Sequence, residues 1–483
     1  MALQLYNTLT RQLQPFHPLQ PGRVTIYACG VTVYDYCHLG HARSYLAWDI
    51  LRRYLAFLGY GVTYVQNFTD IDDKIINRAQ QENITVTEIV QRYIQAYHTD
   101  MARLNIRPAD HYPQATAVMP RIIELIQELV AQGYAYPVQG DVYYAVEKFP
   151  SYGKLSGRHL EQMSAGASGR VVEMEQKKRH PLDFALWKAA KPEEMTVYEP
   201  WDSPWGLGRP GWHIECSAMV SEAFGGTIDI HAGGMDLIFP HHENEIAQSE
   251  AATQTTLANY WLHNGFVTIN TEKMSKSLGN FTTIRALLDS GIDPMAVRLF
   301  ILQAQYRKPL DFTPLALDAA THGWQTLQEG LEFGWTHQDL FTDLDPLPIE
   351  PELKTAFQAS MDDDLNTPAA LAVLFDLAKN LQRQHNQIRH TGSSDQPRDH
   401  LWQQWHSLVK LAAILGLEVT PNSAEPEPEP IITDAEIETL IHQRQQAKQA
   451  KNFAESDRIR DYLGTLGIKL IDQKGGETRW LRS

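Results

Sequence analysis

The chain opens with a strand–helix–strand pattern of hydrophobic and polar positions. Residues 24–29 form a short apolar run of β-favouring side chains, which is typical of a parallel strand buried on both faces. Residues 42–58 carry apolar side chains at helical spacing, and the glycines at 59 and 61 end that helix. A second apolar run follows over residues 62–68. This alternation predicts an α/β fold with a Rossmann-like, doubly wound parallel sheet that binds a nucleotide.

The same alternation continues through the middle of the chain, interrupted by an insertion. Residues 187–212 are dense in proline, glycine and tryptophan, which predicts an ordered, loop-rich segment. Polar side chains at 69–74 follow the second strand, where such sheets place their ligands. The pattern also predicts helices over 86–104 and 119–132, a helix that begins near His241, and strands over 143–146, 227–231, 260–263 and 266–269.

After about Phe312 the strands stop and helical periodicity takes over. Residues 421–430 repeat Glu-Pro, which predicts a stiff acidic linker that we expect to be mobile. Residues 433–483 predict a small unit of one or two helices, followed by Gly-Ile-Lys-Leu at 467–470, a Gly-Gly turn and Arg-Trp at 479–480. The periodicity before the linker predicts a helical bundle with helices over 315–333, 353–361, 368–390 and 400–415.

A chain of 483 residues is too long for one core, and these patterns divide it into segments. We expect the first half of the sheet domain at 1–133, an insertion at 134–225, the second half of the sheet domain at 226–312, a helical domain at 313–416, the linker at 417–432 and the C-terminal unit at 433–483.

The composition narrows the class of protein. Hydrophobic residues make up 43% of the chain and charged residues 21%, as in a soluble globular protein. No apolar run approaches the roughly 20 residues that span a bilayer, and the N-terminus lacks a signal-peptide pattern, so we expect a cytoplasmic protein with no membrane partner. The net charge of −16 argues against non-specific nucleic-acid binding but allows a shaped RNA partner. Three cysteines are too few for a disulfide framework.

The tetrapeptide His-Leu-Gly-His at 38–41 is a candidate phosphate site. It stands at a predicted helix start, where the helix dipole favours anions. Imidazole donors on His38 and His41 can stabilise charge that builds on a phosphate under attack, and Gly40 lets a nucleotide approach the backbone. By themselves the two histidines could equally be capping or surface residues.

A second motif, Lys-Met-Ser-Lys-Ser at 273–277, favours the phosphate-site interpretation of the two histidines. Lys273 and Lys276 can close over a triphosphate and neutralise the departing pyrophosphate. A lysine- and serine-rich loop alone is usually solvated surface. The two motifs together, however, match the two signatures of the class I aminoacyl-tRNA synthetases, so the chain resembles that class.

Four further side chains form a candidate metal site. His241 and Glu245 lie four apart and share a helix face, so they can bind one metal ion; His242 with Glu245 is the weaker alternative. Cys216 and Cys29 complete a plausible tetrahedral zinc set, although the spacing follows no standard zinc-finger pattern. Buried structural cysteines and a solvated acidic helix face would also account for these residues.

The chain further resembles cysteinyl-tRNA synthetases along nearly its whole length. At the motif positions the one departure is Leu39, where the first motif often has isoleucine. The matching blocks are long and specific: Cys-Gly-Val-Thr-Val-Tyr-Asp at 29–35, Asn-Phe-Thr-Asp-Ile-Asp-Asp-Lys at 67–74, Arg-Pro-Gly-Trp-His-Ile-Glu-Cys-Ser-Ala-Met at 209–219, Phe-Pro-His-His-Glu-Asn-Glu at 239–245, and Met-Asp-Asp-Asp-Leu-Asn-Thr-Pro at 361–368.

This resemblance implies roles for individual residues. It implies that zinc binds Cys29, Cys216, His241 and Glu245 and takes the substrate thiol as an extra ligand. It also implies that Thr69, Trp212 and His231 shape the amino-acid pocket and that Asp236 faces the nucleotide ribose. Apolar packing separates cysteine from serine by only about 1–3 kcal/mol, whereas zinc prefers a thiolate, so we expect no editing domain.

The expected activity is therefore the ligation of cysteine to tRNA. Cysteine and ATP, with Mg²⁺, would give cysteinyl-adenylate and pyrophosphate, and the cysteinyl group would then pass to the 3′ end of tRNA(Cys). One alternative is an enzyme that joins activated cysteine to a small amine. Another is a non-catalytic RNA-binding relative on the same scaffold. We expect a monomer.

Two remaining features have simpler interpretations. We expect Cys37 to be a buried core thiol, outside the metal set. The C-terminal segment is locally basic in an acidic chain, which suits contacts with tRNA phosphates and unpaired bases, although a solvated amphipathic helix would look similar. Its candidate contact residues are Lys448, Lys451, Arg458, Arg460, Lys474, Arg479 and Trp480.

Overall fold

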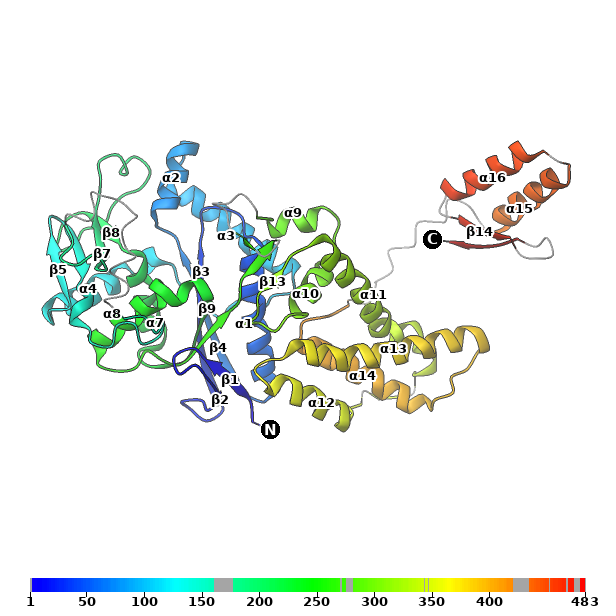
Figure 1. Cartoon of the computed structure of the whole chain (residues 1–483), viewed down its shortest axis with the longest axis horizontal. Helices are drawn as coiled ribbons and strands as arrows, with labels where there is room; N and C mark the ends of the chain where they lie inside the picture. The colour runs from blue at the N-terminus through cyan, green and yellow to red at the C-terminus, as the bar shows by residue number, and fades with distance from the viewer. Residues whose placement is uncertain are drawn as a thin grey trace. The chain divides into compact units, whose positions relative to one another are not determined.

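A computed structural model gives the fold, and it separates into two units, Met1–Val419 and Thr420–Ser483 (Figure 1). The predicted acidic linker at 421–430 lies outside the described residues. The structure describes residues 2–159, 177–269, 272–274, 281–342, 344–345, 347–419, 434–450, 452–465, 468–472 and 478–482.

A four-stranded parallel sheet is the centre of the first unit, with strand order β10-β9-β3-β4. Its strands are β3 (Arg23–Thr32), β4 (Gly61–Thr69), β9 (Ile228–Gly234) and β10 (Ala258–Asn264). The predicted strands at 24–29, 62–68 and 227–231 are confirmed, and each extends further. Helix α1 (Leu39–Phe57) connects β3 to β4 and begins three residues before the predicted start, because His38 caps it. The doubly wound sheet is therefore present as expected.

The insertion has a sheet and a core of its own. Four antiparallel strands pair in the order β5-β6-β7-β8, formed by β5 (Ala135–Val138), β6 (Asp141–Tyr144), β7 (Phe184–Ala189) and β8 (Gly208–Pro210). Trp187 and Tyr144 lie in the core beneath it. The segment predicted to be loop-rich is a loop only over residues 190–207, and both its ends are strands. The strand predicted at 143–146 ends at Tyr144, two residues early.

Helix α7 (Trp212–Phe224) is a helix that the hydrophobic pattern does not predict. Every residue from Ile214 to Val220 is buried, including Glu215 and Ser217. The helix therefore has no polar face and no amphipathic period to detect. It contacts β3 and β4 on one side and α4 and α8 on the other. This central position brings Cys216 to the parallel sheet.

In the rest of the sheet domain the predicted helices over 86–104 and 119–132 and the predicted strands over 260–263 and 266–269 are confirmed, and several further short elements were not predicted. The helix expected near His241 begins as a π-helical turn over Ile238–His242 and continues as α8 (Glu243–Thr253). Strand β11 (Val267–Ile269) leaves the parallel sheet and pairs with β12 and β13 instead. The remaining elements are β1 (Gln4–Asn7), β2 (Gln12–Pro15), α2 (Asp73–Glu82), α3 (Val86–Arg103), α4 (Met119–Ala131), β12 (Glu272–Lys273), α9 (Ile284–Asp289), α10 (Pro294–Leu302) and β13 (Leu310–Asp311).

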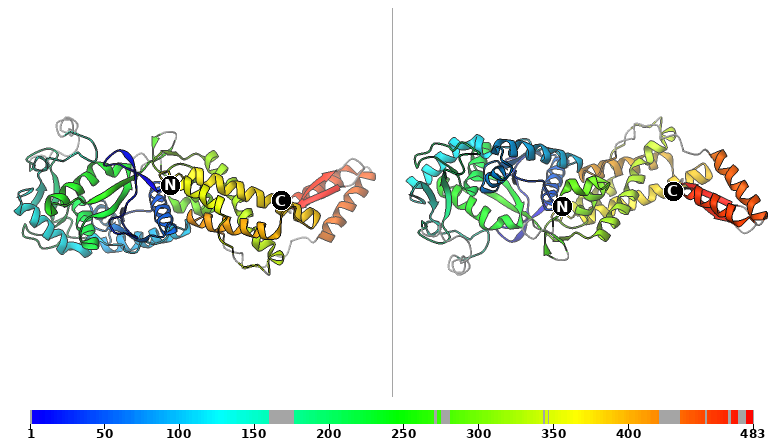
Figure 2. Two further views of the ribbon diagram at one scale, coloured as in Figure 1. Left: turned by 90° about the horizontal axis from the view of Figure 1, so that it is seen from below. Right: turned by 90° about the horizontal axis from the view of Figure 1, so that it is seen from above.

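The predicted helical domain is confirmed as four packed helices. They lie side by side in Figure 2, drawn from olive to orange, and α13 contacts each of the other three. Small residues allow the close approach: a Cβ on Gly330 of α11 would meet Ala378 of α13 at 2.7 Å. The helices are α11 (Pro314–Thr336), α12 (Pro351–Asp362), α13 (Thr367–Thr391) and α14 (Arg398–Ile414).

The second unit folds around a small core of its own. Two helices, α15 (Asp434–Gln449) and α16 (Phe453–Thr465), precede an antiparallel pair of strands, β14 (Ile468–Asp472) and β15 (Thr478–Arg482). The prediction of one or two helices is confirmed, and the segments named after them form the two strands. Its buried residues are Ile437, Ile441, Ile459, Leu463 and Ile468.

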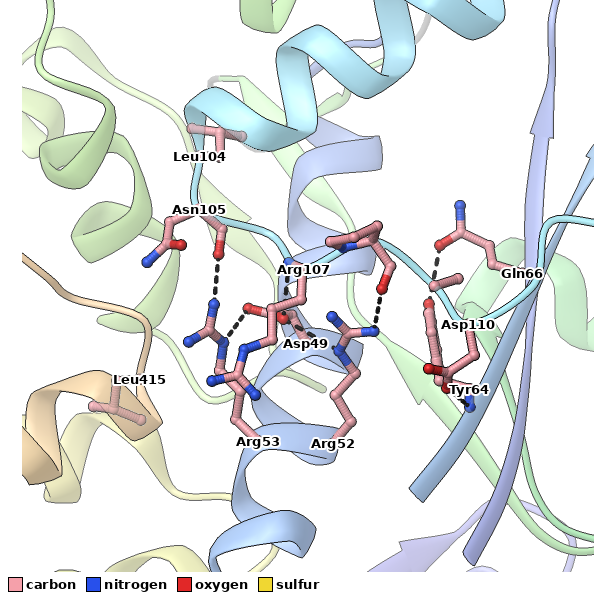
Figure 3. Close-up of polar contacts among 12 residues, drawn as sticks. Asp49, Arg52, Arg53, Tyr64, Gln66, Leu104, Asn105, Arg107, Asp110 and Leu415 are labelled. Atoms are coloured by element: carbon pink, nitrogen blue, oxygen red, sulfur yellow. Dashed lines mark hydrogen bonds and ion pairs between the residues drawn. The ribbon is translucent and has the colours of Figure 1, made fainter. Parts of the chain in front are cut away.

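A buried ion cluster on α1 joins the sheet to the helical domain (Figure 3). The Asp49 carboxylate lies 2.8 Å from Arg53, 3.3 Å from Arg52 and 2.7 Å from Arg298 of α10. Burial by itself raises the pKa of Asp49, but the charges of Arg298 and Arg53 lower it below the usual value. Asp49 is therefore ionised and paired inside the protein.

The arginines of this cluster also donate hydrogen bonds to backbone carbonyls at the end of the helical domain. Arg298 donates to the carbonyl of Leu415 at 2.7 Å, and Arg53 donates to the carbonyl of Ala413 at 3.1 Å. Asn105, on the loop after α3, accepts from both arginines through its own carbonyl. The last turn of α14 is thus hydrogen-bonded to a cluster centred on the helix that follows the His-Leu-Gly-His motif.

We predict that Asp49→Ala lowers the free energy of unfolding of the first unit by about 3–5 kcal/mol, because it leaves three buried guanidinium groups without their carboxylate. Urea unfolding followed by circular dichroism measures the change. Asp318→Ala is the matched control: Asp318 is 70% exposed in its ion pair with His322, and its loss should change stability by less than about 0.5 kcal/mol. Equal stability of the two variants would contradict the role assigned to the cluster.

Candidate functional site

The two histidines of the first motif, His38 and His41, form a capping box at the N-terminus of α1. His38 Nδ1 accepts from the backbone N–H of Gly40 at 3.0 Å, and His41 Nδ1 accepts from the N–H of His38 at 3.1 Å. The rings stack with centroids 3.9 Å apart. Since both Nδ1 atoms accept, each neutral ring carries its proton on Nε2. The pair thus offers two imidazole N–H groups at a helix N-terminus, an arrangement suited to phosphate oxygens.

The position of the His38 ring requires a glycine at position 40. A Cβ on this residue would lie 2.8 Å from the ring of His38. Any side chain would therefore push the ring out of the position in which it caps the helix. The predicted close approach of a nucleotide to the Gly40 backbone stays a prediction.

One pocket of about 190 Å³ joins the first motif to the end of β3. It lies at the carboxyl ends of the parallel strands, where α/β sheets bind their ligands. Asp236, on the short helical turn after β9, also lines it. Among the residues that line it are Cys29, His38, Gly40, His41, Asp236 and Met274.

The Lys-Met-Ser-Lys-Ser segment starts beside this pocket. Lys273 lies in β12, and Met274 donates its backbone N–H to Val267 of β11 at 2.9 Å. Met274 itself is buried and lines the pocket. Lys276 and the rest of residues 275–280 lie outside the described residues, as does the side chain of Lys273.

The residues after this segment return to the first motif. Leu39 donates its N–H to the carbonyl of Thr282 at 3.2 Å, and Ile284 donates to the carbonyl of Cys37 at 2.9 Å. Thr283 forms an isolated bridge with His38. The described chain on either side of residues 275–280 is therefore bonded to pocket-lining elements. Cys37 is buried, as predicted.

The candidate metal ligands meet in one buried cluster. The ligand atoms of Cys29, Cys216, His241 and Glu245 all lie within 4.8 Å of one another. The two sulfurs are 3.9 Å apart, and His241 Nε2 is 3.0 Å from Glu245 Oε1. Two sulfurs on a tetrahedral zinc ion are about 3.8 Å apart when each Zn–S bond is about 2.3 Å. The donor set and its spacing therefore fit zinc, and the cysteines are free thiols.

Four separate elements supply these ligands. Cys29 ends the regular pairing of β3 with β4, where the register shifts, and Cys216 lies on α7. His241 stands on the π-helical turn and Glu245 on the first turn of α8. Asn67 of β4 supports the cluster, since its Oδ1 accepts from the N–H of Gly30 at 2.8 Å and lies 3.8 Å from the Cys216 sulfur.

A second group of possible ligands shares two members with the first. Cys29, His231, His242 and Glu245 also lie within 4.8 Å of one another. His231 Nε2 is 2.8 Å from Glu245 Oε2, and His242 Nε2 is 3.3 Å from the Cys29 sulfur. His242 also contacts His263 at 2.8 Å. Only the first group contains two thiols, which zinc favours.

The charges of the cluster suit a cation. A hydrogen bond with Cys29 contributes most to lowering the pKa of Cys216 to about 6, whereas burial raises the pKa of Cys29. Burial opposes the charge on Glu245, but His231 and His241 hold the pKa of that carboxyl well below its usual value. Burial likewise opposes protonation of His241, and Glu245 overcomes it and raises the His241 pKa to about 10. A divalent cation in place of that proton would be stabilised by the same anionic groups.

The three predicted amino-acid contacts lie around this cluster rather than on the described lining of the pocket. The Thr69 hydroxyl donates to Glu215 Oε2 at 2.9 Å. Trp212 stacks on His241 with ring centroids 4.2 Å apart. His231 is fully buried, holds Glu245 and stacks on Trp261. Their contacts with substrate stay predictions.

Sequence reasoning missed several residues of the site. Asn67 and Glu215 lie inside sequence blocks that match the family, but the sequence alone assigns neither of them a role. His263, which contacts His242, and Trp261, which stacks on His231, lie on β10 near its carboxyl end. Their position at that sheet edge could have marked them as candidates.

Comparison with known proteins decides the family. The model of the tRNA synthetases class I (C) catalytic domain matches residues 15–322, and the DALR domain model matches residues 356–420. The cysteine–tRNA ligase of Cyanothece sp. is 65% identical over 494 aligned residues that cover 100% of both chains. That of Thermosynechococcus vestitus is 65% identical over 485 residues, covering 100% of this chain and 99% of the relative. This chain belongs to the cysteine–tRNA ligase family.

Solved structures of other synthetases share the fold. Methionyl-tRNA synthetase from Mycobacterium tuberculosis, in complex with methionyl-adenylate, superposes with a TM-score of 0.54 at 14% identity, covering 82% of this chain and 90% of that one. A LeuRS from Agrobacterium radiobacter gives a TM-score of 0.58 at 12% identity, covering 83% and 86%. The family membership thus agrees with a class I synthetase fold. Among the described helices, none is both long and apolar enough to cross a membrane.

We predict that Cys216→Ala abolishes stoichiometric binding of zinc by this member of the family, because it removes one of two thiol ligands. Zinc content after dialysis, measured by mass spectrometry, gives the result. Cys37→Ala is the matched control, since Cys37 is a buried thiol outside both candidate groups and its loss should leave the zinc content unchanged. Full zinc content in Cys216→Ala would contradict the assignment.

Proposed function

We propose that this chain is a cysteine–tRNA ligase. It activates L-cysteine with ATP to cysteinyl-adenylate and pyrophosphate, then transfers the cysteinyl group to the 3′ end of tRNA(Cys). The observation that carries the proposal is the pocket that borders both the His38–His41 pair and Cys29, in a chain whose full-length relatives at 58–65% identity are cysteine–tRNA ligases.

The activation step follows from what the residues around the pocket can do. A carboxylate oxygen of cysteine attacks the α-phosphorus of ATP, and the bond to pyrophosphate breaks. The Nε2–H groups of His38 and His41 donate to the phosphate oxygens, where negative charge builds in the transition state. Asp236 accepts from the ribose. Lys273 and Lys276 hold the triphosphate and then the departing pyrophosphate, and Mg²⁺ accompanies ATP.

Cys29, Cys216, His241 and Glu245 are the proposed zinc ligands, in preference to the group with His231 and His242. Zinc bound there would supply a soft Lewis acid that prefers the thiolate of cysteine to the hydroxyl of serine. His231 fixes Glu245 through its 2.8 Å contact, and Trp212 fixes the ring of His241 by stacking. Such contacts set the orientation of metal-binding side chains.

This selection would replace editing. Shape alone discriminates near-isosteres by only about 1–3 kcal/mol, too little for faithful charging. The described part of the insertion is used for the β5–β8 sheet and for α7, which carries Cys216. We therefore propose that this enzyme relies on its thiol site for accuracy.

The helical domain and the second unit are the proposed tRNA-binding parts. The DALR domain match to residues 356–420 supports this role for the helical domain, and it counts against a ligase that uses a small amine. In the second unit, Arg458 pairs with Glu455 at 2.7 Å and Trp480 donates to Glu438 at 2.8 Å. Lys448, Arg460 and Arg479 remain candidate contacts, while Lys451 and Lys474 lie outside the described residues. A monomer in the cytoplasm stays the expectation.

Charging of total tRNA with labelled cysteine tests the function directly. We expect the purified chain to attach cysteine to tRNA, and a large excess of unlabelled serine to leave the rate unchanged, because serine offers no thiolate. Labelled serine should give no detectable charging. Charging with serine at the cysteine rate, or none with either amino acid, would overturn the proposal.

Replacement of Lys276 tests the second motif. Lys276→Ala should lower cysteine-dependent ATP–pyrophosphate exchange by about 10²–10³-fold, because a charge that stabilises the transition state is lost. Zinc content should not change, since no candidate metal ligand is altered. An exchange rate equal to that of the unmodified enzyme would exclude the role.

A further inference from the structure

Glu215 is a buried carboxyl group for which the proposed mechanism has no use. It lies on α7 directly before Cys216 and is 1% exposed. One oxygen, Oε2, accepts from the Thr69 hydroxyl at 2.9 Å, while the other, Oε1, has no hydrogen-bond partner in the described structure. A buried carboxyl oxygen without a donor is costly, and in native proteins such a group calls for an explanation, such as a catalytic role or a bound ion.

Among the described residues, Glu215 forms no ion pair with a lysine, arginine or histidine, and its side-chain hydrogen bond is with Thr69. Burial contributes most to raising its pKa well above the usual value, and Cys216, Asp72 and Asp70 raise it further. The Thr69 hydrogen bond acts in the opposite direction and lowers the pKa of Glu215. Glu215 therefore lacks a cationic partner in ion-pair contact in the described structure, next to a cluster that we propose for the substrate thiol.

The neighbouring carboxylates are already engaged. Both oxygens of Asp70 accept from Thr116, one from its N–H and one from its hydroxyl. Asp72 caps α2 by accepting from the N–H of Lys74 at 2.9 Å. Among Asp70, Asp72 and Glu215, Glu215 is the one with a fully buried oxygen that accepts no hydrogen bond in the described structure.

The position of Glu215 relative to the thiol cluster suits an amino acid. Asn67 and Thr69 are two apart on β4 and share one face of the sheet. Asn67 contacts Cys216, and Thr69 contacts Glu215, so the two contacts lie side by side between β4 and α7. In cysteine only three covalent bonds separate the sulfur from the α-nitrogen. A thiol at Cys29 and Cys216 therefore brings the ammonium group to the region of Thr69 and Glu215.

Hydrogen-bond polarity points to the same ligand group. The single hydroxyl proton of Thr69 is directed at Glu215, so the Thr69 oxygen faces any other partner as an acceptor. Glu215 Oε1 is an acceptor as well when the carboxyl is ionised. An ammonium group carries three donors and one positive charge, which matches these acceptors and the missing cation.

We propose that Glu215 binds the α-ammonium group of the cysteine substrate, directly through Oε1 and indirectly by holding the Thr69 hydroxyl as an acceptor. This inference rests on the proposed function and names a specificity-determining residue for it. Glu215 thereby selects α-amino acids among small thiols, just as the metal cluster selects thiols among amino acids.

The full-length enzyme with Glu215→Gln tests the inference. The KM for cysteine in ATP–pyrophosphate exchange should rise about 10- to 100-fold, as expected for a charge-assisted hydrogen bond replaced by a neutral one. The KM for ATP and the zinc content should not change. Glu222→Gln, an exposed glutamate on the same helix, is the matched control and should leave the cysteine KM unchanged.

Two substrate fragments separate ammonium binding from a merely structural role. Cysteamine keeps the thiol and the ammonium but lacks the carboxylate, whereas 3-mercaptopropionate keeps the thiol and the carboxylate but lacks the ammonium. In Glu215→Gln the inhibition constant of cysteamine should rise as much as the cysteine KM, while that of 3-mercaptopropionate should stay within about twofold. Thr69→Val should give the same selective pattern, and its effect should not add to that of Glu215→Gln.

An unchanged cysteine KM in Glu215→Gln would overturn the inference. Equal weakening of cysteamine and 3-mercaptopropionate in both variants would overturn it too, because the substitutions would then disturb the whole pocket. Neither result touches the proposed function, which stands or falls on tRNA charging by the unmodified enzyme.

Discussion

The paired Asp49 carboxylate is the constraint on which much of the architecture depends. It is buried on α1 and attracts Arg53 of the same helix and Arg298 of α10, which in turn bind the carbonyls at the end of α14. A buried charge tolerates few arrangements, because each partner must be present and correctly placed to offset desolvation. The orientation of α1 against the helical domain is therefore narrowly defined.

That orientation matters because the first residues of α1 line the pocket that borders His38 and His41. His38 caps the helix, and the backbone at Cys37–Leu39 is bonded to residues 282–284, which follow the lysine-containing segment. Two motifs more than 230 residues apart in the sequence, at 38–41 and 273–277, thus share one structural support. Helix α1 therefore connects the ion cluster at the end of α14 to the described residues that flank the second motif.

The candidate metal site is assembled from many elements. Its four candidate ligands come from β3, α7, a π-helical turn and α8. His231 on β9 and His242 on the same π-helical turn contact atoms of these ligands. Each element is fixed by its own packing, which holds the ligand atoms within 4.8 Å of one another. On the proposed function, the same α7 supplies a thiol to the metal and a carboxyl group to the substrate ammonium.

The local sequence pattern by itself determined much of the secondary structure of this protein. The parallel strands, α1 and the four helices after Phe312 follow from apolar periodicity, because each element buries a regular face or run of residues. The phosphate motifs and candidate metal ligands could be recognised from residue type and family resemblance. Only the tertiary structure decided the rest. Helix α7 shows no amphipathic period because every residue from Ile214 to Val220 is buried. Glu215 looks like an ordinary helix carboxylate until its burial and its contact with Thr69 are known. Burial and long-range proximity depend on how distant segments pack, and no local sequence pattern contains that information.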